Sequence, residues 1–177
     1  LNSAAEMMPV SWREFADIHP YVPDDQVRGY HNLIADLNAK LCTITGYDAI
    51  SMQPNSGAQG EYAGLLSIAG YHRANGQGHR NICLIPVNAH GTNPATATMC
   101  GYRVREIPTD AAGDVDVEAL RAAVGPATAG IMLTNPSTLG VFERRIEDIA
   151  SLVHNAGGLL YYDGANLNAI LGKVRPG

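Results

Sequence analysis

Several features that would assign this sequence of 177 residues to a common protein class are scarce or missing. No apolar run approaches the ~20 residues that a helix needs to cross a bilayer, so we expect no membrane partner. The formal net charge is −5, which gives no basic footprint for binding nucleic acid. The cysteines are few and form no CxxC pair, which is typical of reduced, buried thiols in a reducing compartment: Cys42, Cys83 and Cys100.

The sequence also lacks the patterns of a metal site and of a secretory leader. The histidines are scattered, with no H-E-x-x-H motif and no paired cysteines, so we predict no metal site. Nothing at the start resembles a signal peptide. The chain opens without an initiator Met and closes soon after a polar motif, so we interpret both ends as cut boundaries within a longer protein.

What is present is the composition of a globular protein with one core. Hydrophobic residues make up 46% and charged residues 16%, which argues against intrinsic disorder. Residues 1–23 carry three prolines and little periodicity, so we expect an extended lead-in. Its apolar side chains, Trp12 and Phe15 among them, should pack on a domain core formed by residues 24–177.

Apolar spacing predicts a first helix after the lead-in. Asp24 or Asp25 can cap its start, because a carboxylate accepts hydrogen bonds from unpaired amides there. Gly46 is placed to end it. The helical stripe consists of apolar residues three and four positions apart: Val27, Tyr30, Ile34, Leu37, Leu41 and Ile44.

Short apolar runs then alternate with helical stretches. This alternation predicts an α/β fold, with a mostly parallel sheet flanked by helices on both faces. Ligands bind such sheets outside the carboxyl ends of the strands, so residues that follow strands are candidates for a site. The predicted strands are 49–53, 81–87, 102–107, 129–134 and 158–163, and the predicted helices are 58–74, 94–100, 116–123 and 146–155.

The first candidate is the stretch Gln53–Glu61, which follows a predicted strand and opens a helix. Its small residues Ser56, Gly57 and Ala58, with Gln59, allow close backbone approach to a ligand. The unpaired amides at a helix start favour a phosphate group. An ordinary glycine-containing turn explains this stretch about equally well when it is taken alone.

Two further polar stretches follow predicted strands. His90, in Asn88–Pro94, could stack on a flat ring or exchange a proton, although a helix-start cap is the better explanation of this histidine alone. Thr134, in Thr134–Gly140, could contact a cofactor or a substrate, whereas Asn, Pro, Ser and Gly also favour turns for local reasons.

The fourth candidate is Asp163, in Tyr161–Asn166. It ends an apolar strand, where a carboxylate is costly without a partner. A protonated pyridine nitrogen is one such partner, and a helix cap or a buried ion pair is the alternative. In their order along the chain, the four candidates match the cofactor site of fold-type I enzymes that use pyridoxal phosphate.

Longer stretches make the resemblance specific. Gln53–Tyr62, His90–Ala95 and Asp163–Ala169 resemble the P-protein family of the glycine cleavage system, as do Glu6–Val10 and Ile18–Pro20. The resemblance implies a truncated fold-type I large domain from the C-terminal half of that protein. It also implies that pyridoxal 5′-phosphate is the cofactor.

The roles of the site residues are implied by the same resemblance. The phosphate is held at the turn Ser56, Gly57, Ala58 and Gln59. The ring stacks on His90, its nitrogen meets Asp163, and Thr134 and Ala165 are further contacts. The family often has Tyr where this chain has Asn135, so no role is assigned to Asn135.

The family lysine that binds the cofactor covalently has no counterpart in this chain. Lys40 and Lys173 are the only lysines, and neither matches it. The resemblance implies decarboxylation of glycine and transfer of the aminomethyl group to the lipoyl group of H-protein, by a dimeric enzyme. We expect no catalytic residue and no turnover in this piece alone.

Two alternatives remain at this stage. One is another fold-type I enzyme, such as an aminotransferase or a hydroxymethyltransferase relative. The other is a non-catalytic module that binds a phosphate or a nucleotide. The expected location is the cytoplasm if the source is bacterial, or the mitochondrial matrix if it is eukaryotic.

Overall fold

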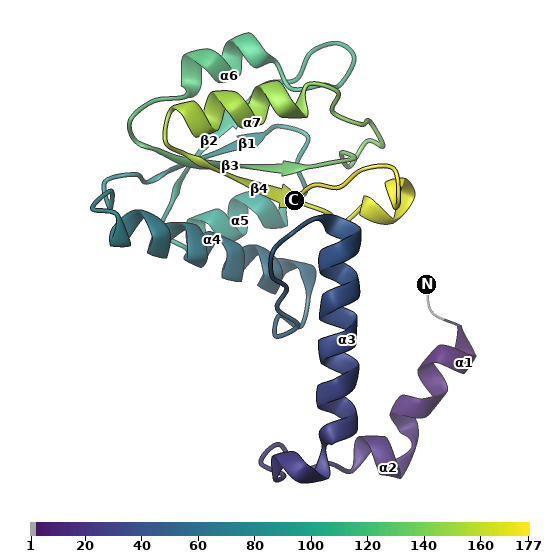
Figure 1. Ribbon diagram of the computed structural model, residues 1–177. Helices are drawn as coiled ribbons and strands as arrows, with labels where there is room; N and C mark the ends of the chain where they lie inside the picture. The colour runs from purple at the N-terminus through teal and green to yellow at the C-terminus, as the bar shows by residue number, and fades with distance from the viewer. Residues whose placement is uncertain (1–2) are drawn as a thin grey trace.

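The computed structural model describes residues 3–177 and shows an α/β body with an N-terminal arm projecting from it (Figure 1). The body contains one parallel sheet, as the sequence predicts, and the structure gives its strand order as β2-β1-β3-β4. Its strands are β1 (Ile82–Pro86), β2 (Arg103–Ile107), β3 (Thr128–Thr134) and β4 (Leu159–Asp163).

Helices cover both faces of this sheet. Helices α4 (Gly57–Ala74) and α5 (Thr92–Met99) lie on one face, and α6 (Val117–Ala123) and α7 (Ile146–Asn155) lie on the other (Figure 1). Successive strand side chains point to opposite faces, so each face has its own apolar core. Leu84 and Ile131 belong to one core, while Cys83 and Met132 belong to the other.

The predicted elements of the body agree with the structure to within two residues, with one exception. Residues 49–53 form no strand, and this prediction is wrong. A strand exists only through pairing with a neighbour, and no described residues pair with this stretch. After β4 the chain forms a short 3-10 helix, η3 (Leu167–Ile170). No helix within residues 3–177 combines the length and apolarity required to span a membrane.

The first segment of the arm is helical, so the expectation of an extended lead-in is wrong. It forms α1 (Ala4–Met7), η1 (Met8–Ser11) and α2 (Arg13–Ala16), while residues 1–2 of the predicted segment lie outside the described range. Ser3 and Glu6 cap α1 reciprocally: the Glu6 amide donates to Ser3 Oγ at 3.3 Å, and the Ser3 amide donates to Glu6 Oε2 at 3.2 Å. This Ser-x-x-Glu capping box was a readable local signal.

The predicted long helix is present as α3 (Arg28–Thr45), and it ends at Gly46, whose φ is +83°. Its predicted cap is wrong, because Asp24 and Asp25 form a separate 3-10 turn, η2 (Asp24–Gln26). Val27 occupies the N-cap position and makes no side-chain capping bond. Only glycine adopts the left-handed conformation of Gly46 without strain, which explains why the end of the helix was easier to predict than its start.

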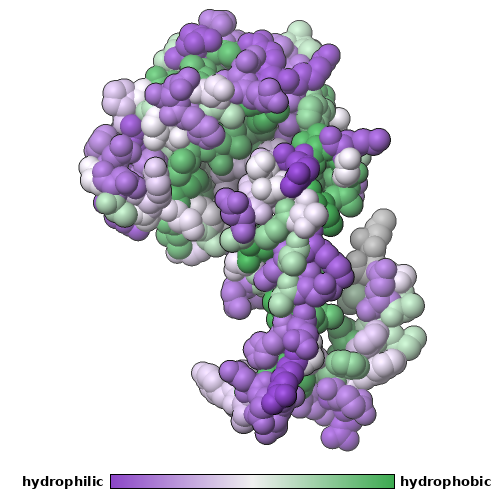
Figure 2. Space-filling model, in the orientation of Figure 1, coloured by the Kyte–Doolittle hydropathy of each residue, from purple (hydrophilic) through white to green (hydrophobic). Residues whose placement is uncertain are grey.

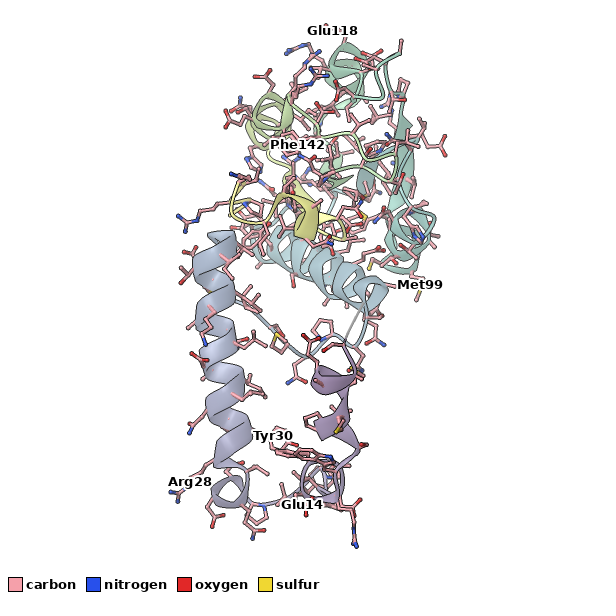
Figure 3. The ribbon with its side chains drawn as sticks, turned by 90° about the vertical axis from the view of Figure 1, so that its right-hand side faces the viewer. Glu14, Arg28, Tyr30, Met99, Glu118 and Phe142 are labelled. Atoms are coloured by element: carbon pink, nitrogen blue, oxygen red, sulfur yellow. The ribbon has the colours of Figure 1, made fainter. Side chains whose placement is uncertain are left out.

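Helix α3 carries the arm away from the sheet and contains no buried residue. Tyr30 points from α3 toward the N-terminal helices (Figure 3). Its hydroxyl donates to the Phe15 carbonyl at 2.8 Å, and the two rings meet edge to face with centroids 6.4 Å apart. Apolar surface is visible along the arm (Figure 2). The predicted apolar stripe of α3 is therefore real, but the described chain leaves much of it exposed: Ile34 41%, Leu37 37% and Ile44 39%.

Candidate functional site

A cavity of about 440 Å³ lies at the edge of the sheet where the strands end. Its volume is in the usual range for small-molecule sites, ~300–1,000 Å³. Six of the eight predicted site residues line it: Gly57, Ala58, His90, Thr134, Asp163 and Ala165. Four other residues line it that were not among the predicted site residues: Glu61, Thr92, Thr138 and Asn166.

The other two predicted residues, Ser56 and Gln59, stabilise the start of α4 and are not among the lining residues. Ser56 is the N-cap, and its Oγ accepts a hydrogen bond from the Gln59 amide at 3.2 Å. The Gln59 side chain turns back and accepts from the Asn55 amide at 2.9 Å. The first amides of a helix have no intrahelical acceptor, so those of Gly57 and Ala58 are available at the cavity wall.

Asp163 ends β4 and is held by three donors from three segments. Thr134 Oγ1 donates to Asp163 Oδ2 at 3.1 Å, and Asn93 Nδ2 donates to the same oxygen at 3.3 Å. The Ala165 amide donates to Asp163 Oδ1 at 3.0 Å. These bonds fix the carboxylate at the cavity wall and satisfy part of its bonding capacity, as expected for a half-buried charge.

His90 lies in the loop between β1 and α5, and its side chain is exposed at the cavity. Its Nδ1 atom lies 2.9 Å from Thr92 Oγ1 and 3.2 Å from the Thr92 amide nitrogen. Thr92 therefore fixes the position of the ring at the cavity wall. The contacts to Thr92, the first residue of α5, place His90 beside the start of that helix, and His90 also lines the cavity.

Glu61 is a buried carboxylate at the same cavity, with 5% of its surface exposed. Its Oε1 atom accepts from Thr92 Oγ1 at 2.7 Å and from Asn93 Nδ2 at 3.1 Å. Its Oε2 atom is buried and has no hydrogen-bond partner in the described chain. One signal could have marked it: Glu61 is a charged residue in register with Leu65 and Ile68 on the buried face of α4.

The turn after β3 is stabilised by the buried side chain of Asn135. Asn135, which precedes Pro136 through a cis peptide bond, is 1% exposed. Its Oδ1 accepts from the Glu143 amide at 3.0 Å. Asn135 therefore stabilises the turn and does not line the 440 Å³ cavity.

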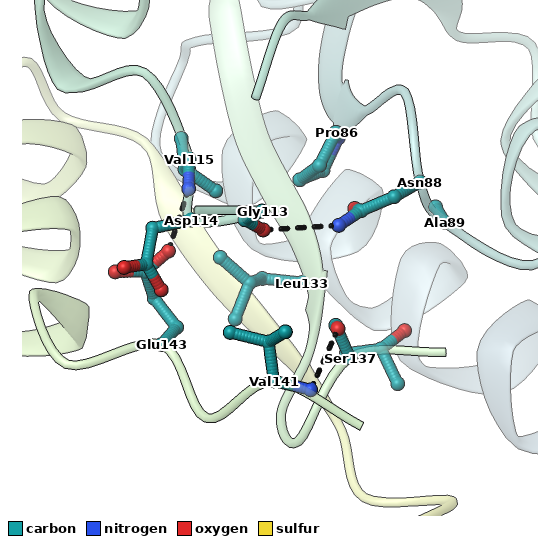
Figure 4. A pocket seen from close by; sticks show the side chains of 11 residues that line it. Pro86, Asn88, Ala89, Gly113, Asp114, Val115, Leu133, Ser137, Val141 and Glu143 are labelled. Carbon is teal, nitrogen blue, oxygen red and sulfur yellow. Dashed lines mark hydrogen bonds between the residues drawn. The ribbon is translucent and has the colours of Figure 1, made fainter. Parts of the chain in front are cut away.

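A second, much smaller cavity of about 20 Å³ lies behind this turn (Figure 4). Glu143 Oε2 accepts there from the Val115 amide at 2.7 Å, and Asn88 Nδ2 donates to the Gly113 carbonyl at 3.3 Å. The space suffices for about one water molecule. We interpret it as a small void left where the loops after β1 and β3 pack together. These loops are also joined directly, because Thr138 Oγ1 donates to the Asn88 carbonyl.

Tyr161 joins helix α4 to the strand that ends in Asp163. A Cβ atom added at Gly64 would lie 2.5 and 2.8 Å from ring atoms of Tyr161, so this crossing requires glycine. Burial raises the pKa of Tyr161 to about 12, and the negative charges of Asp163 and Glu61 contribute to the increase. Tyr161 therefore stays neutral beneath the cavity at physiological pH.

Neither lysine lines this cavity. Lys40 is exposed on α3 and pairs with Asp36, and Lys173 is exposed near the end of the chain. Among residues 3–177, no group of three or more His, Cys, Asp or Glu side chains is arranged to hold a metal ion. The polar groups at the cavity are therefore carboxylates, hydroxyls, an imidazole, the carboxamide of Asn166 and helix-start amides.

Residues 42–169 match the model of the aminotransferase class-V family. The match covers most of the sequence, and the chain belongs to this family. All 177 residues align with glycine dehydrogenase (decarboxylating) of Roseobacter denitrificans at 62% identity, and with the same enzyme of Gluconobacter oxydans at 60%. The chain spans 19% of the length of each of these relatives. The resemblance to the P-protein of the glycine cleavage system is thereby confirmed.

Solved structures support the fold. A glycine decarboxylase (P-protein) of the glycine cleavage system, in inhibitor-bound form, aligns with 90% of this chain and 35% of its own, with a TM-score of 0.74 and 18% identity. Mouse CSAD aligns with 96% of this chain and 38% of its own, with a TM-score of 0.75 and 16% identity. The predicted fold-type I α/β architecture is confirmed.

Proposed function

We propose that this chain is the cofactor-binding part of a glycine decarboxylase and that its large cavity binds pyridoxal 5′-phosphate. The proposal rests on one observation, which is that three suitable groups line the same cavity. The start of α4, the His90 ring and the Asp163 carboxylate come from separate segments and line one cavity. A phosphate, an aromatic ring and a ring nitrogen each find a chemically suitable group there.

The phosphate end fits the start of α4. This helix has 18 residues, so its aligned peptide dipoles favour an anion at its first turn. Gly57 and Ala58 carry little or no side chain, and apart from the adjoining residues and the backbone of α4 no atom lies within 4 Å of the place where a Cβ of Gly57 would stand. A phosphate can therefore approach the amides of both residues closely, while Ser56 and Gln59 keep the helix start in place.

The ring end fits Asp163 and His90. The Asp163 carboxylate would accept a hydrogen bond from a protonated ring nitrogen and keep that proton in place, while His90 would flank the ring and Thr134 and Ala165 would complete the wall. The protonated cofactor ring withdraws electrons from a bound amino acid, which weakens the bond to its carboxylate. The contribution of this chain is to bind the ring, orient it and hold the proton on its nitrogen.

We further propose that this chain alone binds the cofactor without turnover. Lys40 and Lys173 are exposed and absent from the cavity lining, so neither can supply the covalent attachment. In the longer protein, the substrates would be glycine and the lipoyl group of H-protein, and the assembly would be a dimer, in the cytoplasm if the source is bacterial. We propose no nucleic-acid partner, because the net charge of −5 provides no basic footprint.

The test is a titration of the ligand-free chain with pyridoxal phosphate, followed by visible absorbance and equilibrium dialysis. We expect saturable binding that inorganic phosphate weakens by competition. Pyridoxal without the phosphate should bind less tightly. If pyridoxal phosphate bound no more tightly than inorganic phosphate, the cavity would be a phosphate-binding module. Glycine–bicarbonate exchange should be absent, and measurable exchange would contradict the second proposal.

A further inference from the structure

Glu61 occupies a position at which a carboxylate is unusual. Together with Leu65 and Ile68 it forms the buried face of α4, and only 5% of its surface is exposed. Burial of a charge is unfavourable unless hydrogen bonds compensate for the lost water. Glu61 has such bonds on one oxygen only, because Oε2 is buried without a partner in the described chain.

The bonded oxygen of Glu61 connects it to both predicted ring contacts. Oε1 accepts from Thr92 Oγ1 at 2.7 Å, and Thr92 Oγ1 lies 2.9 Å from His90 Nδ1. Oε1 also accepts from Asn93 Nδ2 at 3.1 Å, and the same nitrogen donates to Asp163 Oδ2 at 3.3 Å. Thr92 therefore links Glu61 to His90 through hydrogen bonds, and Asn93 links Glu61 to Asp163 in the same way.

The Asn93 amide has one favourable orientation in this network. Its nitrogen faces Glu61 and Asp163, whereas its oxygen is buried without a hydrogen-bond partner. A flipped amide would place that oxygen against two carboxylate oxygens, which can only accept when ionised. The two carboxylates thus fix the amide, and the amide holds the Asp163 carboxylate.

The position of the hydrogen on His90 follows from the same logic. Because the Thr92 hydroxyl gives its hydrogen to Glu61, Thr92 Oγ1 can only accept from His90. The 2.9 Å contact then requires a hydrogen on Nδ1. In the competing arrangement Nδ1 accepts from the Thr92 amide at 3.2 Å, and two lone pairs then face each other at the shorter 2.9 Å contact. A hydrogen on Nδ1 gives up the longer amide bond and keeps the shorter hydroxyl bond. The charge on Glu61 strengthens the hydroxyl chain, which favours the first arrangement.

We propose that Glu61 is a positioning residue of the cavity: through Thr92 it places the neutral-ring hydrogen of His90 on Nδ1, and through Asn93 it holds Asp163. The Nε2 lone pair of His90 is then left as an acceptor at the cavity. The proposal rests on the proposed function for the identity of the ligand. The hydrogen position itself is a property of the ligand-free chain, so the two can fail independently.

The test is nitrogen-15 NMR of the histidine rings in mildly alkaline buffer, where an ordinary imidazole is neutral. His90 is one of six histidines, and His90→Asn identifies its signals by their loss. In the wild-type chain we expect Nδ1 to be the protonated nitrogen of His90. In Glu61→Met, which keeps the length of the side chain and removes the carboxylate, the Nε2-protonated form should become the major one.

Thr92 provides a second pair of variants. Thr92→Val keeps the shape of the side chain and removes the hydroxyl, so it should cause the same change as Glu61→Met. Thr92→Ser keeps the hydroxyl and should restore the wild-type spectrum. Glu118→Met is the matched control, because Glu118 is exposed on α6 and outside the cavity lining.

The outcomes separate clearly. Nε2 protonation in the wild-type chain, or an unchanged His90 spectrum in both Glu61→Met and Thr92→Val, would overturn the proposal. If Glu61→Met failed to fold, Thr92→Val and Thr92→Ser would decide. Binding of pyridoxal phosphate to the same variants is measured separately, so a chain with the expected hydrogen position and no binding would reject only the proposed function.

Discussion

Thr134 and Asp163 are register partners at the ends of β3 and β4, and the Thr134 hydroxyl donates to the Asp163 carboxylate at 3.1 Å. The two residues are 29 positions apart in sequence, and parallel pairing brings them together at one edge of the sheet. This edge carries the large cavity, so the register of one strand pair determines where the predicted ring-nitrogen contact lies.

Removal of the charge of Asp163 should weaken cofactor binding. Asp163→Asn keeps the shape of the side chain and removes the anion that would pair with a protonated ring. A hydrogen bond to a charged group contributes about 1.5–3 kcal/mol, so the dissociation constant should increase by roughly 10- to 100-fold. Equilibrium dialysis of pyridoxal phosphate measures it. Asp148→Asn, on the exposed surface of α7, should bind like the wild type, and equal affinity in both variants would argue against the role of Asp163.

A methyl group at Gly64 should destabilise the fold. Gly64→Ala places Cβ within 2.8 Å of the Tyr161 ring, and overpacking of this kind costs about 1–3 kcal/mol. Gly70→Ala is the matched control in the same helix, because apart from the adjoining residues and the backbone of α4 no atom lies within 4 Å of its added Cβ. That control should be neutral or more stable by up to about 1 kcal/mol. Urea unfolding followed by circular dichroism measures both, and equal midpoints would contradict the packing of Tyr161 against α4.

Stability should decrease in alkaline solution. Burial raises the pKa of Cys83 from 9.0 to about 12, with a smaller contribution from Cys100, and that of Tyr161 from 10.0 to about 12. Both groups are neutral in the folded chain over a range in which the unfolded chain ionises. Their stabilising effect is therefore complete below pH 9 and is lost as the pH rises toward 12.

Urea midpoints at a series of pH values measure this decrease. Cys83→Ala removes one of the groups, so its decrease should be smaller than that of the wild type, although its stability at neutral pH will be lower. A midpoint that stayed constant from pH 9 to 12 would show that these groups ionise equally well in both states.

The N-terminal arm should promote self-association of the chain. Leu33 on α3 is 63% exposed, and it lines an apolar groove of about 520 Å³ together with Phe15 and Tyr30. Exposed apolar surface of this kind favours contact between copies. Light scattering at increasing concentration should show a mass above 18.8 kDa, and Leu33→Glu should lower it. Glu118→Gln on α6 should leave it unchanged, whereas a wild-type chain that stayed monomeric would contradict the prediction.

Elements with a strong local signal were predictable from the sequence. The helix 146–155 was predicted with its observed ends, and Gly46 ends α3 as expected. Signals of this type lie within a few residues of each other, so no knowledge of the fold is required. The Ser3 capping box was equally local, and the expectation of an extended lead-in overlooked it.

Elements that depend on distant partners were not predictable in the same way. Residues 49–53 are apolar enough for a strand, yet the described chain offers them no partner. The stripe of α3 has helical spacing, which says nothing about what covers it. Strand pairing and side-chain burial depend on residues that are distant in sequence. A sequence pattern indicates the local conformation and does not identify those distant partners.

The site divides along the same line. The sequence by itself determined the α/β class and the order of chemical groups along the chain, because strand ends and helix starts have local patterns that place Ser56, His90 and Asp163. Only the tertiary structure decided that Glu61 and Asn93 join them, and that Ser56 and Gln59 support the helix start behind the lining. The physical reason is that a hydrogen bond between residues 32 or 70 positions apart depends on how the sheet and helices pack.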